Sequence, residues 1–590
     1  MGVNEGNIMK NKSDYPSESK KHFNNYSYLD KHPIVPNMSI YNILKMLSKL
    51  YKNNVALDCL KLQMTYSELL DNSTTLSKSF SLLGVKKDDI VAVCMPNFTQ
   101  AVCVFLAANR LGAITTFLNP NSNEKENIKY LNEYESRLLI NYNKDYEYNK
   151  RLKDNTKLDN IITLSSADLN RKDFNQNSNS FSSYSDFISY SDLKIISNFN
   201  KQITKDFNDK TLILYTSGST GLPKKVVLTN KNIIASGIYM KNTSHLKFKP
   251  NEKSMITIPF CYPYGFVTSL LMSLLCGRNS ILTPYLSQQN IEYYLKKQPN
   301  YIFGCPAILE FILKLDNKEL DLSSVTDFIT GGDFLPDSKY DEAIQFFNNH
   351  NSNINLCNGS GNAETAGANT ITFGSKIKKG TVGKVLVGSD VIVVNPDTLE
   401  EVKYNEIGML CINGKHIFDG YYKDEKLTNE KFIFVNNKKY FKTENYGFLD
   451  TDGYFTLLGR TSRFYINSDI NKVYCENLQS IINKFSYVSE CVVVPKPDDE
   501  KLYVSKAFVV LKDNYKSTPN ICNILMNDLH NFSDKNSEYY LKEYEFPSSI
   551  EFVNSIPLTS ANKIDYKKLE NEAVLEYNKE KGKAKKLVKE

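Results

Sequence analysis

The chain has 590 residues, which at roughly 100 to 200 residues per domain is enough for more than one folded domain. Hydrophobic residues make up 41% and charged residues 23% of the sequence, close to the averages of globular proteins, so a disordered, collagen-like or disulfide-scaffold protein is excluded. The sequence has 72 Lys and Arg residues and 66 Asp and Glu residues, which gives a net charge of +6. Because this charge is small and spread along the sequence, we expect no nucleic-acid partner.

Cysteines and histidines show no metal-binding pattern. The eleven cysteines are scattered from Cys59 to Cys522 without a CxxC pair, and the six histidines form neither HxxxH nor HxH. Residues 1–37 are polar and rich in Lys and Asn, without the apolar segment of a secretory signal peptide. We therefore expect reduced thiols, no zinc cluster and a cytoplasmic location.

The first part of the chain alternates between helix-like and strand-like patterns. An amphipathic pattern from Thr65 to about Leu83, stopped by Gly84, predicts a helix, and the apolar run Ile90–Met95 predicts a buried strand. A second helix is expected from Ala101 to Leu111. Further strands are predicted at Leu138–Tyr142, Leu212–Tyr215 and Asn300–Phe303. Such alternation is typical of parallel sheets, so the predicted fold class is α/β.

The segment Met255–Gly277 carries no charged residue and is long enough to be considered as a membrane span. Pro259, Pro263 and Gly265 interrupt it, together with several Ser, Thr and Tyr residues. We expect a strand, a turn and a buried helix there, and no transmembrane segment.

Changes in composition divide the rest of the chain. Residues 165–210 are rich in Ser, Asn and Asp and predict a long connection on the surface. From about 381 to 458, short β-like runs alternate with Gly and Asn turns, which predicts a β-rich subdomain. Strand-like runs such as Cys491–Val494 follow a boundary near residue 460 and indicate a smaller, separate α+β region.

The most informative stretch, Leu212 to Thr229, reads LILYTSGSTGLPKKVVLT. A buried strand leads into a loop in which Gly218 and Gly221 allow positive φ and close approach of the backbone to a ligand. Polyphosphate oxygens can be bound there by backbone N–H groups, by Lys224 and by the hydroxyls of Thr216, Ser217, Ser219 and Thr220. The spacing is GxxGxxK, so neither GxxxxGK[ST] nor GxGxxG is matched. The alternative interpretation is a flexible Ser/Gly surface turn.

The stretch YTSGSTGLPKKVVLT resembles the signature of the adenylate-forming superfamily: acyl-CoA synthetases, aryl-CoA ligases such as 4-coumarate ligase, nonribosomal peptide adenylation domains and firefly luciferase. Further segments match the family in order over about residues 38 to 570: DLSSVTDFITGG (321–332), GYYKD (420–424), GFLDTDGYF (447–455), Gly459 with Arg460, and IPLTSANKID (556–565).

The resemblance implies a domain organisation. It places a large AMP-binding domain, α/β with a β-rich subdomain, at 38–459, and a small mobile α+β AMP-binding domain at 460–575. A polar extension at 1–37 and a lysine-rich tail at 576–590 flank them.

The resemblance also implies a two-step reaction. A carboxylate attacks the α-phosphate of ATP with Mg²⁺ present, giving acyl-AMP and pyrophosphate, and a thiol then takes the acyl group, with coenzyme A as the favoured acceptor. Because both reactants of the first step are anionic, the site must neutralise charge. Glu364 stands at the position of the family's magnesium-binding glutamate, Lys563 at that of its C-terminal catalytic lysine, and Arg460 at that of its ribose-binding arginine. In isolation, each of these three is also typical of a solvated surface residue.

The family frame assigns a set of candidate residues to each part of the site. The catalytic candidates are Lys563, Glu364 and Lys224, with Glu364 as the metal ligand. The nucleotide-binding candidates are Thr216, Ser217, Gly218, Ser219, Thr220, Gly221, Lys224, Gly331, Gly332, Asp333, Ser360, Asn445 and Arg460. The acyl-pocket candidates are Tyr262, Tyr264, Gly265, Phe266, Ala307 and Gly361.

Several nucleotide-site positions depart from the family pattern. The family's YGxTE motif supplies an aromatic ring for adenine and a threonine for the α-phosphate, but Ser360 and Ala363 stand there. The family's TGD motif, whose aspartate accepts from both ribose hydroxyls, is replaced by Thr443, Glu444 and Asn445. An amide is a weaker acceptor than a carboxylate, and each loss costs about 1 to 3 kcal/mol.

Other departures lie around the acyl and thiol paths. Tyr262 replaces a histidine that orients the carboxylate, and Lys225 replaces the glycine after the loop lysine. Ser468 with Asp469, and Asn562, replace glycines of the small domain, so extra side chains narrow the path of the thiol.

The sequence thus predicts an acid–thiol ligase that uses ATP, Mg²⁺ and coenzyme A to activate a small-molecule carboxylate. No acidic residue between Pro259 and Phe266 is present to pair with a substrate α-amine, so an aliphatic (fatty) or aromatic acid is favoured over an amino acid. One alternative is a catalytically impaired nucleotide- or acyl-binding pseudoenzyme of the same fold, motivated by Ser360, Ala363 and Asn445. Another is an acyl-AMP ligase that loads an acyl carrier protein.

Overall fold

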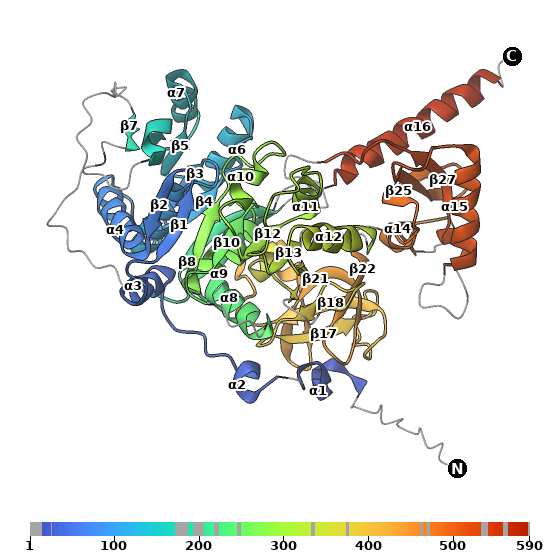
Figure 1. Cartoon of the computed structure of the whole chain (residues 1–590), viewed down its shortest axis with the longest axis horizontal. Coiled ribbons are helices and arrows are strands. Elements are labelled where there is room, and N and C mark those ends of the chain that lie inside the picture. Colours follow the sequence, from blue (N-terminus) through green and yellow to red (C-terminus); the bar gives the residue numbers. More distant parts are fainter. Residues whose placement is uncertain are drawn as a thin grey trace, which may run out of the picture.

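The computed structural model describes residues 14–24, 26–170, 187–190, 193, 206–216, 224–244, 249–331, 335, 337–372, 377–460, 464–468, 472–532, 541–558 and 564–587. Two large sheets and one smaller sheet form the first part of the chain, and a separate small domain follows at the right of Figure 1. This arrangement confirms the predicted α/β class, with a large N-terminal and a small C-terminal domain.

The first large sheet has eight strands in the order β19-β9-β8-β4-β3-β5-β6-β7. From β8 to β7 neighbouring strands are parallel, whereas β9 is antiparallel to both β8 and β19. A parallel strand covered on both faces needs a continuous apolar run, and every residue of β3 is buried. The strands are β3 (Ile90–Cys94), β4 (Ile114–Phe117), β5 (Leu138–Tyr142), β6 (Asn160–Leu164), β7 (Ile188–Ser189), β8 (Lys210–Thr216), β9 (Lys224–Thr229) and β19 (Gly420–Tyr421).

The second large sheet has nine strands in the order β16-β15-β14-β13-β12-β10-β11-β1-β2. The strands from β14 to β1 are parallel, and both edges are closed by antiparallel pairs. The strands are β1 (Val55–Cys59), β2 (Leu62–Thr65), β10 (Lys253–Ile256), β11 (Asn279–Leu282), β12 (Tyr301–Gly304), β13 (Asp327–Gly331), β14 (Asn355–Ser360), β15 (Thr370–Ile371) and β16 (Lys384–Val385).

Local sequence signals set the ends of the helices. Helix α4 (Tyr66–Leu82) begins with a capping box in which Thr65 and Glu68 satisfy each other's backbone N–H groups. Helix α5 (Thr99–Leu111) ends at Gly112, whose φ of 83° lies in the left-handed region that glycine favours. Both helices confirm the predictions. Further helices of the large domain are α1 (Pro16–Ser19), α2 (Tyr28–Lys31), α3 (Ile40–Leu50), α6 (Glu124–Tyr134), α7 (Tyr146–Asp154), α8 (Asn230–Ser244), α10 (Ile291–Leu295), α11 (Pro306–Leu313), α12 (Asp337–Asn349) and α13 (Glu425–Glu430).

The uncharged segment Met255–Gly277 forms the predicted strand, turn and buried helix. After β10, a π-helical stretch (Tyr264–Leu271) continues into α9 (Met272–Leu275), and the residues from Gly265 to Leu274 are buried. Within the described ranges, no helix is both long and apolar enough to cross a bilayer.

The connection expected on the surface over 165–210 is partly buried. Leu169, Phe187 and Tyr190 each expose 7% or less of their surface, and Ile188 and Ser189 form the edge strand β7. For these residues the structure therefore corrects the expectation of a surface connection. Their side chains pack against the large domain. The mostly polar composition of the segment gives no sign of these few buried residues.

The predicted β-rich subdomain is a five-stranded antiparallel sheet in which β17, β18, β21 and β20 follow one another and β22 also pairs with β21. The N-terminal residues pack on it, as the position of α1 beside β17 in Figure 1 shows. Ser17 donates a hydrogen bond to Glu401, and Lys20 donates one to Asp390. The Nδ1 atom of the buried His22 is 2.5 Å from the hydroxyl oxygen of Tyr404. The strands are β17 (Asp390–Val394), β18 (Gly408–Asn413), β20 (Phe432–Val435), β21 (Lys438–Leu449) and β22 (Phe455–Arg460).

The small domain has an apolar core of its own. One cluster gathers around Leu478, Val493 and Leu525, and a second joins the sheet to Leu569 and Ala573 of α16. Helix α16 extends through Leu587, so it includes most of the segment expected as a lysine-rich tail. The elements are β23 (Phe464–Ile466), β24 (Lys472–Tyr474), α14 (Cys475–Ile482), β25 (Val488–Asp498), β26 (Leu502–Leu511), α15 (Pro519–Phe532), β27 (Pro547–Phe552) and α16 (Tyr566–Leu587).

Candidate functional site

The hydroxyl- and glycine-rich loop joins two antiparallel strands. Strand β8 ends at Thr216 and β9 begins at Lys224. These two residues are register partners, so both ends of the loop lie side by side at the same end of the two strands. Of the predicted loop residues, Ser217, Gly218, Ser219, Thr220 and Gly221 lie outside the described residues, as does the side chain of Thr216. Their phosphate-binding roles stay predictions.

Glu364 lies buried beside the strand that follows the loop. Its side chain is on a short 3₁₀ turn after β14, it exposes 7% of its surface, and the Tyr421 hydroxyl donates a 2.6 Å hydrogen bond to its Oε1. The Phe418 N–H donates to the Glu364 carbonyl at 2.7 Å, which fixes the backbone. Tyr421 belongs to β19, which pairs with β9. Glu364 is thereby tied to the strand that starts at Lys224.

Tyr421 is a site residue that the sequence reasoning missed. Burial raises the pKa of its hydroxyl, and the neighbouring Glu364 carboxylate raises it further, so the tyrosine stays a neutral donor. The segment GYYKD, which contains Tyr421, resembles a segment of the family, but the resemblance gives Tyr421 no role. Its strand pairing with β9 is what brings the hydroxyl to the glutamate.

Lys224 lies in a group of charged side chains. Its Nζ is 5.9 Å from the centroid of the Tyr421 ring. Burial lowers the pKa of Lys224, and the like charge of Lys431 lowers it further, while Glu444 and Glu364 oppose the shift. Lys431 itself forms an ion pair with Glu444.

The lysine after Lys224 also has a partner. The Lys225 ammonium lies 3.1 Å from Oε2 of Glu133 on α6, and the Tyr215 hydroxyl donates to the same oxygen at 3.2 Å. Lys225, which stands where the family has glycine, is therefore part of an ion pair that ties β9 to α6.

Ser360 and Asn445 meet at the end of β14. Asn445 exposes 2% of its surface, and its Nδ2 donates to the Ser360 hydroxyl at 3.2 Å. Asn445 is the register partner of Arg460 across β21 and β22. The three predicted nucleotide-site positions are thus neighbours, although the Arg460 side chain lies outside the described residues.

The backbone packs closely beside Ser360 and Asn445. Gly331 and Gly359 are register partners in β13 and β14. At Gly361 an added Cβ would lie 2.1 Å from the Gly367 carbonyl oxygen, so only glycine fits there. Gly332 and Asp333 lie outside the described residues, and their place near adenine stays a prediction.

The acyl-pocket candidates lie on and around the π-helical stretch. The Tyr264 hydroxyl lies 2.9 Å from the Gly304 carbonyl oxygen and 2.6 Å from that of Ile329, and burial raises its pKa. Phe266 has no exposed surface and packs edge-on against Phe105, with ring centroids 4.7 Å apart. Tyr262 is partly buried, and burial raises the pKa of its hydroxyl as well.

Ala307 stands in the first turn of α11 and is partly buried. An added Cβ at Gly265 would lie 2.4 Å from the Ile258 and Pro259 carbonyl oxygens, so glycine lets the chain pass close to itself. The assignment of all these residues to an acyl pocket stays a prediction.

Lys563 lies outside the described residues, but the ends of its segment are held together. Leu558 and Ile564 form an isolated antiparallel bridge, and the Asp565 N–H donates to the Pro557 carbonyl at 2.8 Å. Helix α16 begins directly afterwards. The catalytic role of Lys563 stays a prediction.

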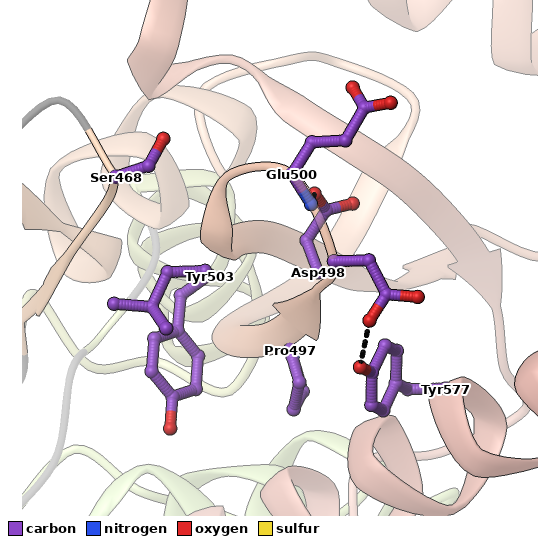
Figure 2. A pocket seen from close by; sticks show the side chains of 8 residues that line it. Ser468, Pro497, Asp498, Glu500, Tyr503 and Tyr577 are labelled. Atoms are coloured by element: carbon purple, nitrogen blue, oxygen red, sulfur yellow. Dashed lines mark hydrogen bonds between the residues drawn. The ribbon is translucent and has the colours of Figure 1, made fainter.

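A hollow of about 530 Å³ lies on the small domain, between the β25–β26 turn and α16. Figure 2 shows Asp498, Glu500, Tyr503 and Tyr577 on its wall, where the Tyr577 hydroxyl donates to Asp499 at 2.5 Å. Lys581 pairs with the same carboxylate at 2.6 Å. Its acidic lining repels polyphosphate, so this hollow is not the nucleotide site.

Comparison with known families identifies the family of this chain. The family model for AMP-binding enzymes matches residues 48–422, more than half of the chain, and the model for their C-terminal domain matches residues 477–563. The chain belongs to the AMP-binding enzyme family. The resemblance to the adenylate-forming superfamily is therefore confirmed.

The AMP-binding relatives are distant but cover most of the chain. A probable 4-coumarate–CoA ligase 2 of Dictyostelium discoideum is 26% identical over 454 residues, 74% of this chain and 79% of the relative. A long-chain-fatty-acid–CoA ligase of Bacillus subtilis (strain 168) is 24% identical over 549 residues, 90% of this chain and 94% of the relative.

Solved AMP-binding structures share the fold. The anthranilate CoA ligase AuaEII in complex with anthranoyl-AMP superposes with a TM-score of 0.77 at 19% identity, covering 94% of this chain and all of that one (100%). ATP-bound MatB from Rhodopseudomonas palustris gives a TM-score of 0.76 at 19% identity, covering 90% of this chain and 99% of that one. At these identities the likeness shows the fold alone.

Proposed function

We propose that this chain activates a carboxylic acid with ATP, forming acyl-AMP and pyrophosphate, and then transfers the acyl group to a thiol. The observation that carries the proposal is the link from Glu364 through the Tyr421 hydroxyl to β9, the strand that follows the hydroxyl- and glycine-rich loop. A buried carboxylate and a lysine at one end of such a loop suit the neutralisation of a polyphosphate and its metal.

Glu364 holds the Mg²⁺ that accompanies ATP. In the described part of the chain, no three His, Cys, Asp or Glu side chains gather to hold a metal ion by themselves. Magnesium is commonly bound by one or two carboxylates together with substrate phosphates, and a single buried carboxylate fits that mode. When bound, the ion supplies positive charge to phosphate oxygens.

The residues of this chain divide the work of the first step. Lys224 and the loop N–H groups bind the phosphates, and Gly331, Gly332 and Asp333 border the adenine. Asn445 already donates an N–H to Ser360, so its carbonyl oxygen is the atom that accepts from a ribose hydroxyl, beside Arg460. Lys563 brings positive charge to the α-phosphate during adenylation and leaves when the small domain rotates.

The acid is an aliphatic or aromatic carboxylate, and coenzyme A is the acceptor. The named activities of the relatives, toward 4-coumarate and long-chain fatty acids, support this class of substrate. The segment with Tyr262, Tyr264 and Phe266 carries no acid to hold an α-amine, which argues against an amino acid. A carrier-protein thiol is the alternative acceptor, detected as a mass increase of the carrier protein.

A nucleotide-binding pseudoenzyme is the second candidate function. The specific observation in its favour is that Ser360 and Asn445 bond to each other, where the family resemblance expects an aromatic ring and a ribose-binding carboxylate. Such a protein would bind nucleotide without turnover.

Pyrophosphate release from magnesium ATP, measured across short, medium, long and aromatic acids with and without coenzyme A, tests the proposal. We expect release that depends on one class of acid and that falls at least 100-fold in Lys563→Ala, by analogy with the loss of other transition-state charge partners, at roughly 10² to 10³. Lys567→Ala, an exposed lysine in the next helix, is the matched control and keeps full activity. Folded protein that releases no pyrophosphate with any acid would refute the proposal and favour the pseudoenzyme.

A further inference from the structure

Glu444 adopts a backbone conformation that its residue type disfavours. Its φ is +63°, in the left-handed region where a side chain costs energy that glycine avoids. It stands on β21 directly before Asn445, which the site geometry places beside Ser360. Strain of this kind persists where surrounding contacts hold it, and it is concentrated at functional sites.

The Glu444 side chain forms an ion pair with Lys431. Lys431 directly follows helix α13, and its N–H donates to the Thr428 carbonyl at 3.1 Å, so its backbone is fixed. Its side chain is only 13% exposed, and that of Glu444 is 29% exposed. A pair shielded to this degree holds the lysine in one orientation better than an exposed pair does.

The orientation places a second ammonium group beside Lys224. Both lysines lie beside Tyr421: its N–H donates to the Thr428 hydroxyl at 2.9 Å, the Thr428 carbonyl accepts from Lys431, and the Lys224 Nζ is 5.9 Å from the Tyr421 ring centroid. In agreement with this placement, the like charge of Lys431 lowers the pKa of Lys224. Two ammonium groups in a partly buried site repel each other until an anion of high charge joins them. A lysine has three N–H donors, so Lys431 can keep its bond to Glu444 and still donate to another oxygen.

We propose that Lys431, oriented by Glu444, is a phosphate-binding residue of this site and binds the pyrophosphate end of ATP together with Lys224. The inference deepens the proposed function and rests on it. Lys431 supplies a phosphate donor in a site where Ala363 stands in place of the family's threonine. Glu444 is a positioning residue, since it acts through Lys431 and not on the nucleotide.

Calorimetric titration of the full chain with ATP, pyrophosphate and AMP tests the inference. In Lys431→Ala we expect affinity for ATP and for pyrophosphate to fall roughly 10-fold, the loss of one charge-assisted hydrogen bond, while affinity for AMP changes less than about 2-fold. Lys431→Arg keeps most of the affinity because it keeps the charge. Lys426→Ala removes an exposed lysine of α13 and the same net charge, so it is the matched control.

Glu444→Gln separates positioning from direct binding. It keeps the side-chain shape but removes the charge that orients Lys431, and we expect a smaller loss of ATP affinity than in Lys431→Ala, with AMP affinity again unchanged. A purely structural ion pair predicts a different result: both variants lose thermal stability, and neither distinguishes ATP from AMP.

The outcomes separate the inference from the proposed function. If Lys431→Ala binds ATP as wild type does, or loses ATP and AMP affinity equally, the inference is overturned while acid-dependent pyrophosphate release can still stand. If wild type releases no pyrophosphate with any acid but its ATP affinity depends on Lys431, the proposed activity fails and the phosphate-binding role holds. Wild type that binds no ATP overturns both.

Discussion

At the scale of single residues, the site depends on buried polar groups that satisfy one another. Glu364 is buried with its Oε1 occupied by the Tyr421 hydroxyl, and Asn445 is buried against Ser360. A buried carboxylate without such a donor would lose much of its hydration without replacement. The same pairing holds Glu364 in one position, as its proposed role as a metal ligand requires.

Replacing Tyr421 with Phe removes only the hydroxyl that donates to Glu364. We expect the free energy of unfolding to fall by about 1 to 3 kcal/mol, because a buried acceptor loses its donor. The Mg²⁺ concentration needed for half-maximal pyrophosphate release should rise, because Glu364 is no longer held in place. Thermal unfolding and a magnesium titration measure the two effects.

Tyr422→Phe is the control for this change, since it removes a hydroxyl from the neighbouring, half-buried tyrosine. A Tyr421→Phe protein whose magnesium dependence matches that of wild type would contradict the role given to Tyr421.

At the scale of elements, helix α16 is attached to the small sheet by charge as well as by apolar packing. Lys506, with 2% of its side chain exposed, binds Glu551 at 2.6 Å and also pairs with Glu576 of α16. Lys496 binds Glu576 at 2.9 Å and Glu580 at 3.1 Å. These pairs orient the helix that directly follows the segment of Lys563.

Glu576→Gln leaves the buried Lys506 with one carboxylate partner instead of two. We expect the small domain to lose about 3 kcal/mol of stability, because removing one partner of a buried ion pair leaves a charge poorly compensated. Chemical denaturation followed by circular dichroism measures the loss, and adenylation should fall with it.

Glu580→Gln removes a more exposed partner, 57% exposed, from the same helix, and should cost less than about 1 kcal/mol. Equal losses in the two variants would show that the buried network does not anchor α16.

At the scale of the whole molecule, segments far apart in the sequence are joined through buried polar residues. These residues have almost no contact with solvent in the folded state. His22 packs the N-terminal segment against Tyr404 of the β-rich subdomain, and His416 lies fully buried near the Tyr239 ring. Burial lowers the pKa of His22 to about 3, with Lys20 lowering it and Asp390 opposing this. Burial alone lowers the pKa of His416 to about 3.

Because these two histidines are buried, we expect acid to lower the free energy of unfolding of the large domain. Both folded-state pKa values lie below the ordinary value of 6.5, so protonation favours the unfolded chain, and stability present above pH 6.5 is lost as the pH falls toward 3. At pH 5 each histidine should cost about 2 kcal/mol relative to pH 7. Urea unfolding followed by circular dichroism at pH 7 and pH 5 measures this.

In His22→Gln, the difference in stability between pH 7 and pH 5 should shrink by about 2 kcal/mol. Other titrating groups, including Glu401, are the same in both proteins and cancel. His32→Gln, which changes an exposed histidine, should leave the difference unchanged. An undiminished difference in His22→Gln would disprove the contribution of that residue.

Much of the fold was readable from the sequence because its signals are local. The helix that begins after Thr65, the buried strand at Ile90–Met95 and the helix closed by Gly112 are predicted from signals that act within a few residues, and each prediction matches an observed element. The hydroxyl- and glycine-rich loop between β8 and β9 is recognisable for the same reason, because it is a short contiguous motif. Glu364 is assigned only through the family resemblance, and its contact with Tyr421 joins residues far apart in the sequence.

The sequence by itself determined the α/β class, the division into a large and a small domain and the segments in which the site is proposed. Only the tertiary structure decided which side chains meet: Tyr421 reaches Glu364 because β19 pairs with β9, and Lys431 reaches Glu444 because β20 and β21 form a hairpin. Contacts between residues far apart in sequence depend on strand order and register. Those are set by the packing of the whole core, which no short pattern records.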